Sequence, residues 1–270
     1  MMPTGHLPKL NDQDFRFLQR LMLEESGIRM AEQKRTLVAG RLMGRLRSLQ
    51  LQDYSQYLQL LNRPESVDER RTVIDLLTTN ETYFFREPQH FTVLGEWVAR
   101  QRRPLHLWSA ASSSGEEAFS MAMTVAEHAR TQDWSVFASD ISRRVLERAR
   151  SATYSIDQAG QFPAGWLKRH CLRGVEESEG LLRISQPLRH RVTFAEVNLM
   201  RPLPQGIGPF DVIFLRNVLI YFAAEQKREI VNRLLERLRP GGLLFIGHAE
   251  SLHGFGLPLR TLRPSVFERQ

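Results

Sequence analysis

The sequence predicts an α/β protein, in which a doubly wound parallel sheet follows an all-helical N-terminal domain. Over the first 90 residues, apolar residues recur at helical spacing and no strand pattern is present. From residue 105 onward, short apolar runs alternate with helical periods, which is typical of parallel strands joined by crossover helices. We therefore expect a helical domain at 1–90 and a sheet-containing domain at 91–270.

The helical domain shows start and stop signals for each element. Asn11 is suited to cap a helix whose apolar face carries Phe15, Leu18 and Met22, and Gly27 is suited to end it. Proline at a first helical position marks one further start. The expected helices run from Asn11 to Gly27, from about Met30 to Leu49, from Asp53, after Pro64, and from Pro88 toward Pro104.

The second domain is predicted strand by strand from its apolar runs. Between 152 and 191 the alternation breaks, and CLRG and LLRIS flank the acidic turn VEESEG, so we expect a small inserted β-subdomain there. The expected helices are Glu116–Ala129, Ser142–Arg150 and Ala224–Leu238. The expected strands are Leu105–Ala110, Ser135–Ser139, Val192–Val197, Asp211–Leu215 and Leu243–Gly247, the last one launched by a Pro-Gly-Gly turn.

Composition excludes several classes of protein. The 270 residues are 42% hydrophobic, which is enough for a sizeable core. The single cysteine, Cys171, excludes an internal disulfide and a cysteine-built zinc site, and no apolar run approaches the ~18 residues that span a bilayer. We expect a cytoplasmic monomer that is neither exported nor inserted in a membrane. The net charge of +7 allows an acidic partner surface or nucleic acid and does not select between them.

The first strand is followed by the turn WSAASSSGEEAFS. Its small residues let a ligand approach the backbone, and the helix that follows offers free N–H groups, so the turn predicts a nucleotide-type site. Glu116 and Glu117 stand where an anion site would have no acids, which favours a cationic ligand. The alternative is a plain turn whose acids stabilise a helix N-terminus.

Two later strands also end in polar residues. Asp140 at the end of the second strand is placed to accept hydrogen bonds from ribose hydroxyls, although it could instead cap the helix that begins at Ser142. The block FDVIFLRNVLIYF places Arg216 and Asn217 at a strand's carboxyl end. Tyr221 follows, and ordinary core packing is the alternative explanation for it.

Five segments, in this order, resemble the chemotaxis receptor methyltransferases, the CheR family: TTNETYFFRE, WSAASSSGEEAFSMAM, FASDIS, FDVIFLRNVLIYF and LRPGGLLFIGHAESL. The resemblance implies a methyltransferase-type, Rossmann-like sheet with an inserted β-subdomain and a helical N-terminal domain. It also implies transfer of a methyl group from S-adenosylmethionine to glutamate side chains on the cytoplasmic helices of chemoreceptors, with S-adenosylhomocysteine as the product.

The resemblance also assigns site residues. Acids near the first turn suit the sulfonium and amino groups of the cofactor, and its carboxylate suits an arginine fork or amide donors. Arg86 and Tyr221 are the candidates for holding the attacking carboxylate, which is already ionised at neutral pH and needs no general base. No metal is expected. The implied cofactor contacts are Asn80, Thr82, Arg86, Glu117, Asp140, Asn198, Leu199, Arg216 and Asn217.

Positive charge is concentrated in the second helix, where residues 29–49 carry a net charge of +5. On a helical wheel Lys34, Arg41 and Arg45 lie within roughly 40° of one another, so we expect them to face an acidic receptor helix. The alternative is a solvated basic face that is partly tied into the core.

Two rival functions stay open at this point. A methyltransferase of the same fold could act on RNA or on a small molecule, but no aromatic-rich basic groove supports this and we expect no nucleic-acid partner. A non-catalytic module could sense the cofactor, but the acid, Arg-Asn and Tyr positions are all filled.

Overall fold

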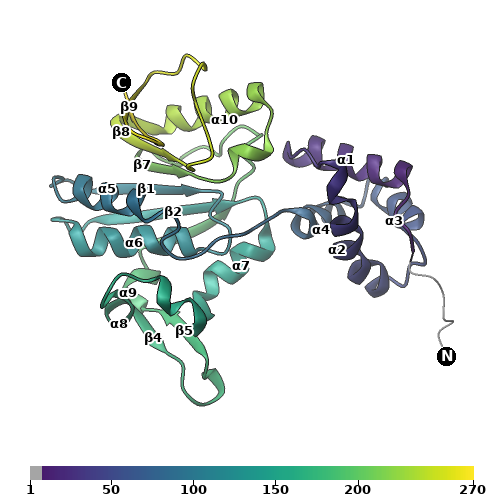
Figure 1. The fold of residues 1–270 in the computed structure, drawn as a ribbon, viewed down its shortest axis with the longest axis horizontal. Coiled ribbons are helices and arrows are strands. Elements are labelled where there is room, and N and C mark those ends of the chain that lie inside the picture. The colour runs from purple at the N-terminus through teal and green to yellow at the C-terminus, as the bar shows by residue number, and fades with distance from the viewer. Residues whose placement is uncertain (1–7) are drawn as a thin grey trace. The chain divides into compact units, whose positions relative to one another are not determined.

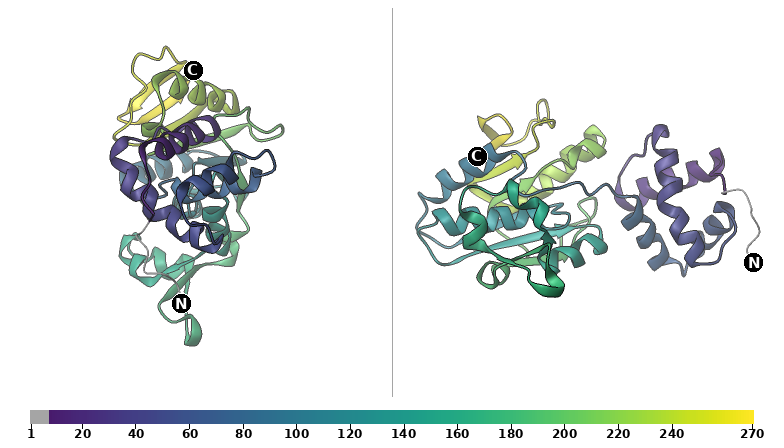
Figure 2. Two further views of the ribbon diagram at one scale, coloured as in Figure 1. Left: turned by 90° about the vertical axis from the view of Figure 1, so that its right-hand side faces the viewer. Right: turned by 60° about the horizontal axis from the view of Figure 1, so that its bottom comes forward.

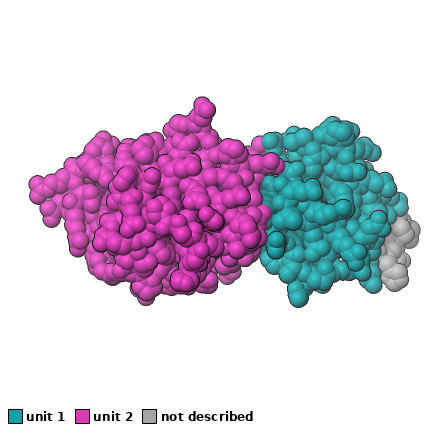
Figure 3. Space-filling view, turned by 90° about the horizontal axis from the view of Figure 1, so that it is seen from above, with its two compact units in different colours: residues 1–79 teal, residues 80–270 magenta. Residues whose placement is uncertain are grey.

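The structure, a computed structural model, describes residues 8–270. The chain forms two compact units that divide between Thr79 and Asn80, coloured separately in Figure 3. The observed border therefore lies about ten residues before the border that the sequence predicted at residue 90. The difference arises because Phe84 and Phe85 are buried in the hydrophobic core of the second unit, so the segment before residue 90 belongs to that unit.

The first unit contains helices only. Asn11 caps its first helix as predicted, since its side chain accepts a hydrogen bond from the Asp14 N–H at 2.8 Å, and Gly27 ends the helix in the left-handed conformation. The second helix begins later than expected, because a 3-10 turn replaces its first residues. The elements are α1 (Asp12–Ser26), η1 (Glu32–Lys34), α2 (Arg35–Ser48), α3 (Tyr54–Leu61) and α4 (Val67–Leu77).

The second unit is built on a seven-stranded sheet with the order β6-β2-β1-β7-β8-β10-β9. The five strands from β6 to β8 are parallel, which confirms the predicted doubly wound sheet. The order of the strands in the sheet differs from their order in the chain, because β2 and β6 lie on one side of β1 and β7 and β8 lie on the other. The strands are β1 (Leu105–Ala110), β2 (Trp134–Asp140), β6 (Val192–Glu196), β7 (Phe210–Leu215), β8 (Leu238–Ile246), β9 (Leu259–Arg263) and β10 (Val266–Arg269).

The antiparallel pair β9 and β10 was not predicted. Strand β9 is the sheet edge and is largely exposed, so its sequence LRTLR shows no apolar run. The strand expected from Leu243 also begins earlier, at Leu238, because its first residues pair with β7 through an irregular register.

Helices cover the sheet in the second unit (Figure 1). Helices α5 and α6 contribute Phe91, Leu94 and Phe119 to one continuous core with Phe214 and Phe245 of the sheet. Alternate strand residues point away from that core, and α10 packs against β8. These helices are α5 (Pro88–Val98), α6 (Glu116–His128), α7 (Arg143–Ser151) and α10 (Ala224–Arg237), and the turn η4 (Leu219–Tyr221) lies between β7 and α10.

The predicted β-subdomain is present between α7 and β6. Its strands β4 and β5 form the expected antiparallel hairpin, and a third strand, β3, pairs with β5 on the other side. Figures 1 and 2 show this hairpin projecting from the second unit. The elements are β3 (Thr153–Ser155), η2 (Ile156–Gln161), α8 (Trp166–His170), β4 (Cys171–Arg173), η3 (Glu176–Ser178), β5 (Leu181–Ile184) and α9 (Gln186–Arg189). Within residues 8–270, none of the helices has the length and apolar character needed to cross a bilayer.

Candidate functional site

The candidate site lies at the carboxyl edge of the parallel sheet. Strands β2, β1, β7 and β8 are neighbours and run in the same direction, so the residues that follow them meet at one edge. This topology gathers four segments that are far apart in sequence. They are the turn 111–115, Asp140, the pair Arg216-Asn217 and the turn 247–250.

The turn after β1 has the close backbone approach expected from its small residues. Ala111, Ser113 and Gly115 all have positive φ angles. Gly115 is required by space as well as by conformation, because an added Cβ would lie 2.9 Å from the Cβ of Ala149 and 3.0 Å from Tyr154 Oη. The Ser112 hydroxyl is buried and has no hydrogen-bond partner among the described residues. The turn therefore holds a buried hydroxyl that no described residue satisfies.

Asp140 is fixed at the end of β2 by backbone donors on both sides. Its Oδ2 accepts from the Ser113 N–H and its Oδ1 from the Ser142 N–H, each at 2.9 Å. Ser142, not Asp140, caps α7 through its own hydroxyl, which removes the helix-cap alternative for Asp140. The Ser113 hydroxyl donates to the Asn80 carbonyl oxygen at 3.0 Å, so the turn also holds the start of the second unit.

Arg216 is the charged centre of the site, and its side chain is only 1% exposed. Its guanidinium lies 2.9 Å from Glu87 Oε2 and 3.1 Å from Glu117 Oε2, and it donates to the Arg86 carbonyl oxygen at 2.5 Å. The Ser109 hydroxyl donates to Glu117 at 2.6 Å. With both carboxylates ionised, this group carries one negative charge in excess, which suits a cationic ligand.

Burial and charge act in opposite directions on these carboxyl groups. Burial raises the pKa of Glu117, and the charge of Arg216 opposes that rise. Burial also works to raise the pKa of Glu87, but the hydrogen bond and charge of Arg216 hold it below its ordinary value. Arg216 therefore keeps one acid ionised at neutral pH and partly compensates the burial of the other.

The segment 80–86 runs along this edge. Arg86 donates through Nη1 to the Glu81 carbonyl oxygen at 2.9 Å, and its guanidinium lies 5.8 Å from the ring centre of Tyr83. Arg86 is half-buried, and so is Thr82. The Arg86 carbonyl contact with Arg216 connects this segment to the charged centre.

Asn198 and Leu199 follow β6, beside β2. The Val197 N–H donates to the Asp140 carbonyl oxygen at 3.0 Å, which brings this loop next to Asp140. Asn198 Oδ1 accepts from the Met200 N–H at 2.9 Å, and Leu199 is buried. The loop therefore presents one polar and one apolar side chain side by side.

Two acids of the site were not predicted, Glu87 and Glu250. Glu87 Oε1 accepts from Asn217 Nδ2 at 3.2 Å and from the His248 N–H at 3.3 Å. Glu250 accepts from the backbone N–H groups of Asn217 and two residues that follow it, and from that of Gly247. Both lie inside quoted motifs, FFRE and GHAES, so the only signal for them was an acid within a motif that resembles the family.

Glu87, His90 and His248 form a group whose ligand atoms lie within 4.8 Å of one another. A metal ion there would have to share Glu87 Oε2 with the Arg216 guanidinium, which lies 2.9 Å from that oxygen. Two cations at this separation repel, so we read the three residues as part of the Arg216 network.

Tyr221 ends η4, four residues after Asn217, and is half-buried. Its N–H donates to the Val218 carbonyl oxygen at 3.2 Å. The structure therefore places Tyr221 in the same short segment as Asn217, immediately after β7.

The predicted receptor residues lie in the first unit, where the side chains of Arg41 and Arg45 bind neighbouring residues. Arg41 donates through Nη1 to the carbonyl oxygens of Leu77 and Thr78 at 3.1 and 2.8 Å, at the end of α4. Arg45 donates to Glu69 through Nε at 2.8 Å and Nη2 at 2.5 Å. Lys34 ends η1 and is half-buried. The basic stripe is thus partly tied into the first unit, as the alternative explanation expected.

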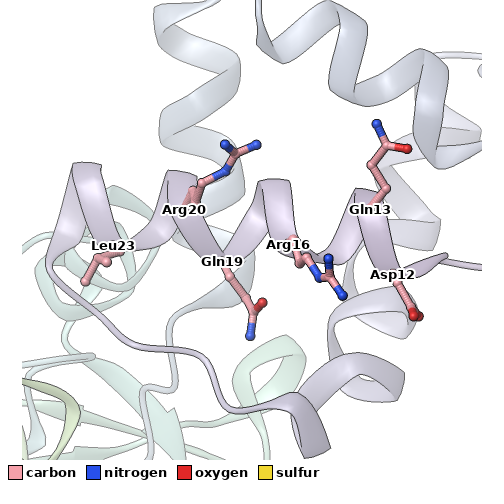
Figure 4. Close-up of a pocket in the computed structure, with 6 residues that line it drawn as sticks. All are labelled: Asp12, Gln13, Arg16, Gln19, Arg20 and Leu23. Carbon is pink, nitrogen blue, oxygen red and sulfur yellow. The ribbon is translucent and has the colours of Figure 1, made fainter.

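Hollows among the described residues also lie away from this site. One, of about 680 Å³, is lined by residues of α1. Figure 4 shows Gln13 and Arg20 on one side of this helix and Arg16 and Gln19 on the other. Another, of about 520 Å³, lies at the opposite end of β1 and includes Arg103 and Arg239. Neither is lined by a residue predicted for the site. The first is lined by Asp12, Gln13, Arg16, Gln19, Arg20 and Leu23.

Comparison with known proteins identifies the class of each unit. Residues 80–263 match the family model described as "CheR methyltransferase, SAM binding domain", so the second unit is of the S-adenosylmethionine-binding methyltransferase class. Residues 13–78 match "CheR methyltransferase, all-alpha domain". The chain belongs to the CheR methyltransferase family, as the sequence motifs predicted.

Individual relatives are similar over most of their length. The chain is 43% identical to a chemotaxis protein methyltransferase of Escherichia coli over 90% of this chain and 85% of that protein. It is 42% identical to the one of Salmonella typhimurium with the same coverage. It is 39% identical to chemotaxis protein methyltransferase 2 of Pseudomonas aeruginosa over 94% of this chain and 92% of that protein.

Proposed function

We propose that this protein methylates glutamate side chains on the cytoplasmic helices of chemoreceptors, with S-adenosylmethionine as the methyl donor. The observation that carries the proposal is the set of family-motif residues that meets at the carboxyl edge of the sheet around Arg216 and Asp140. The relatives are all named for the methylation step of chemotaxis. The proposal places the reaction in the cytoplasm, where the receptor helices lie.

The residues at this edge fit the cofactor by their chemistry. Asp140 is a buried carboxylate in the position of a ribose acceptor, and the carboxyl groups of Glu87 and Glu117 beside Arg216 suit the sulfonium and amino groups. Asn198 and Leu199 supply one polar and one apolar side chain for the adenine. The cofactor contacts we propose are Asn80, Thr82, Arg86, Glu117, Asp140, Asn198, Leu199, Arg216 and Asn217.

The chain's own contribution to the reaction is orientation. S-adenosylmethionine supplies an activated methyl group when bound, and the receptor glutamate, with an ordinary pKa of ~4.3, is already an anion at neutral pH. No residue has to remove a proton. Holding the two reacting groups in line is worth ~7 kcal/mol or more, and we assign that role to Arg86 and Tyr221. A tight ion pair with Arg86 would lower the nucleophilicity of the carboxylate, so the Tyr221 hydroxyl, which gives one neutral hydrogen bond, is the better orienter.

Receptor binding is proposed for the basic face that Lys34, at the end of η1, forms with Arg41 and Arg45 of α2. The internal contacts of Arg41 and Arg45 leave both side chains half-exposed, so each can hold α2 in place and still attract an acidic helix.

The experiment mixes the protein with methyl-labelled S-adenosylmethionine and a receptor cytoplasmic fragment. Label that is incorporated into the fragment and released by mild base identifies methyl esters. A fragment whose methylated glutamates are replaced by glutamine should take up no label. Fragments that stay unlabelled, while RNA or a small molecule is methylated by the same protein, would overturn the proposal.

Two variants connect the activity to the site. Asp140→Ala should weaken cofactor binding by ~1.5–3 kcal/mol, the cost of a charge-assisted hydrogen bond. Asp133→Ala removes an exposed acid at the other end of β2 and should bind as the unmodified protein does. Calorimetry with S-adenosylhomocysteine measures both.

A further inference from the structure

The Glu250 carboxylate accepts hydrogen bonds from four backbone N–H groups. Its Oε2 accepts from Gly247 at 2.6 Å and from Asn217 at 3.0 Å. Its Oε1 accepts from Leu219 at 2.6 Å and from Ile220 at 3.3 Å. One side chain thus joins the turn after β8 to the segment between β7 and Tyr221.

The contact leaves no room for a side chain at Gly247. A Cβ added to Gly247 would lie 2.6 Å from Asn217 Nδ2 and 2.9 Å from both Asn217 N and Glu250 Oε2. Asn217 itself has φ +58°, a conformation that costs free energy for a residue with a side chain. The Asn217 turn is therefore strained and closely packed, and Glu250 supplies the bonds that hold it.

A carboxylate is suited to this task. The N–H groups of Asn217, Leu219 and Ile220 converge from an irregular turn and the first residues of a 3-10 turn, where no carbonyl of a regular ladder serves them. Successive N–H groups in such a turn form a concave anion site, and bonds to an ionised acceptor are stronger than neutral ones. Glutamine would present one NH₂ donor to N–H groups that are also donors.

We propose that Glu250 is the positioning residue of the methyl-transfer site. It fixes Asn217 against the Arg216 and Glu87 network and holds the segment that ends in Tyr221. The catalytic consequence rests on the proposed function, whereas the structural consequence does not. Glu250 itself touches neither substrate nor cofactor in this assignment, because its oxygens are occupied by the backbone.

The structural test measures hydrogen–deuterium exchange by mass spectrometry. In Glu250→Gln, amides in the peptide 216–222 should exchange at least about tenfold faster, since bonds to a charged acceptor are lost. Peptides of the first unit should be unchanged. Glu225→Gln, an exposed acid at the start of α10 and four residues after Tyr221, is the matched control. Unchanged exchange in 216–222 would overturn the proposal.

The functional test is a double-mutant cycle on methylation of the receptor fragment. Glu250→Gln should lower kcat by about tenfold with a smaller change in the KM for the fragment, because orientation and not docking is lost. In a Tyr221→Phe background the same change should have a clearly smaller effect on kcat, because both variants then act on one hydrogen bond. Fully additive effects would overturn the positioning role.

A second variant covers the case in which Glu250→Gln does not fold. Gly247→Ala keeps the Glu250 side chain but places a Cβ 2.9 Å from both Asn217 N and Glu250 Oε2, so it should disturb this contact, raise exchange in 216–222 and lower kcat in the same way. Normal exchange and normal kcat in Gly247→Ala would overturn the positioning role of Glu250. A native protein that never methylates receptor fragments refutes the proposed function instead, and the exchange result still decides the role of Glu250.

Discussion

The carboxyl edge of the sheet and the basic helix α2 carry the two groups of charged residues that sequence analysis singled out. At the sheet edge, parallel strands force residues from distant segments together, and Asp140 and Arg216 do meet the turn and the acids around them. On α2, helical spacing put Arg41 and Arg45 on one face, yet their partners come from another helix, α4. Topology predicts convergence, whereas the periodicity of one helix says nothing about what its face contacts.

The largest expected effect tests the sheet edge. Arg216→Met leaves Glu87 and Glu117 without their buried partner, so the free energy of unfolding of the second unit should fall by about 3–5 kcal/mol. Binding of S-adenosylhomocysteine should be lost as well. Denaturant unfolding measures the first effect, and Arg102→Met, which changes an exposed arginine, should leave both properties intact. Equal stability of the two variants would show that the Arg216 network is not structural.

A pH effect separates the two regions further. His90 is 1% exposed, and burial, together with the charge of Arg216, lowers its pKa to about 4. Because the unfolded chain binds a proton at about 6.5 and the folded one does not, stability should fall as the pH drops from 6.5 toward 4, by up to about 3 kcal/mol. Glu87, His248 and Arg216 face the same ring.

Thermal unfolding between pH 7.5 and 4.5 checks this expectation. His90→Leu should remove most of the pH dependence of the second unit, and His253→Leu, at an exposed position, should not. In the first unit, the hydrogen bond from Arg45 lowers the pKa of Glu69, so its contribution is complete above about 4.5 and is lost only as the pH falls through the lowered value. The same slope in His90→Leu and the native protein would contradict the assignment.

Most of the fold could be predicted because it is encoded in local periodicity. Buried strands such as β7 read as continuous apolar runs, and Asn11 and Gly27 mark the ends of a helix directly. The hairpin of β9 and β10 could not be predicted, because an exposed edge strand does not need an apolar run. Its place in the sheet is decided by pairing with β8, which leaves no local mark in the sequence.

The site could be predicted only where a residue's position implied its role. Asp140 and Arg216 end strands, and strand ends meet. Glu87 and Glu250 follow no strand directly, and their importance comes from the N–H groups and the guanidinium that they accept from across the fold. Arg41 is a different case, because the sequence singled it out but did not reveal its partner. Its contact with the carbonyl groups at the end of α4 depends on how two helices pack, which the sequence of one helix does not show.

The basic helix allows a matched test. Arg41→Gln and Arg45→Gln should each lower the stability of the first unit by about 1–2 kcal/mol, because each removes hydrogen bonds to α4. Arg47→Gln, at an exposed position on the same helix, should change it by less than about 0.5 kcal/mol. Chemical denaturation of the three variants gives the comparison.

Receptor binding by this basic stripe is read from Arg41→Gln and Arg45→Gln together with Lys34→Gln, at a temperature where all three variants are folded. If the stripe attracts an acidic helix, Lys34→Gln, Arg41→Gln and Arg45→Gln should raise the KM for the receptor fragment at low salt, and the difference should shrink as salt screens exposed charges over ~8–10 Å. Cofactor affinity should not change. A KM that is unaltered in all three variants would leave α2 a purely structural role.

The smallest expected effect concerns Tyr221, which lies on the Glu250-held segment at the sheet edge. Tyr221→Phe keeps the ring and removes one hydroxyl, so fold and cofactor affinity should persist while kcat falls about three- to twelvefold, the worth of one neutral hydrogen bond of ~0.5–1.5 kcal/mol. The pH profile of kcat should gain no new limb near neutrality, because no proton has to leave the substrate. Single-turnover methylation of the receptor fragment isolates the chemical step. Unaltered turnover there would return Tyr221 to simple packing and leave Arg86 as the group that orients the carboxylate.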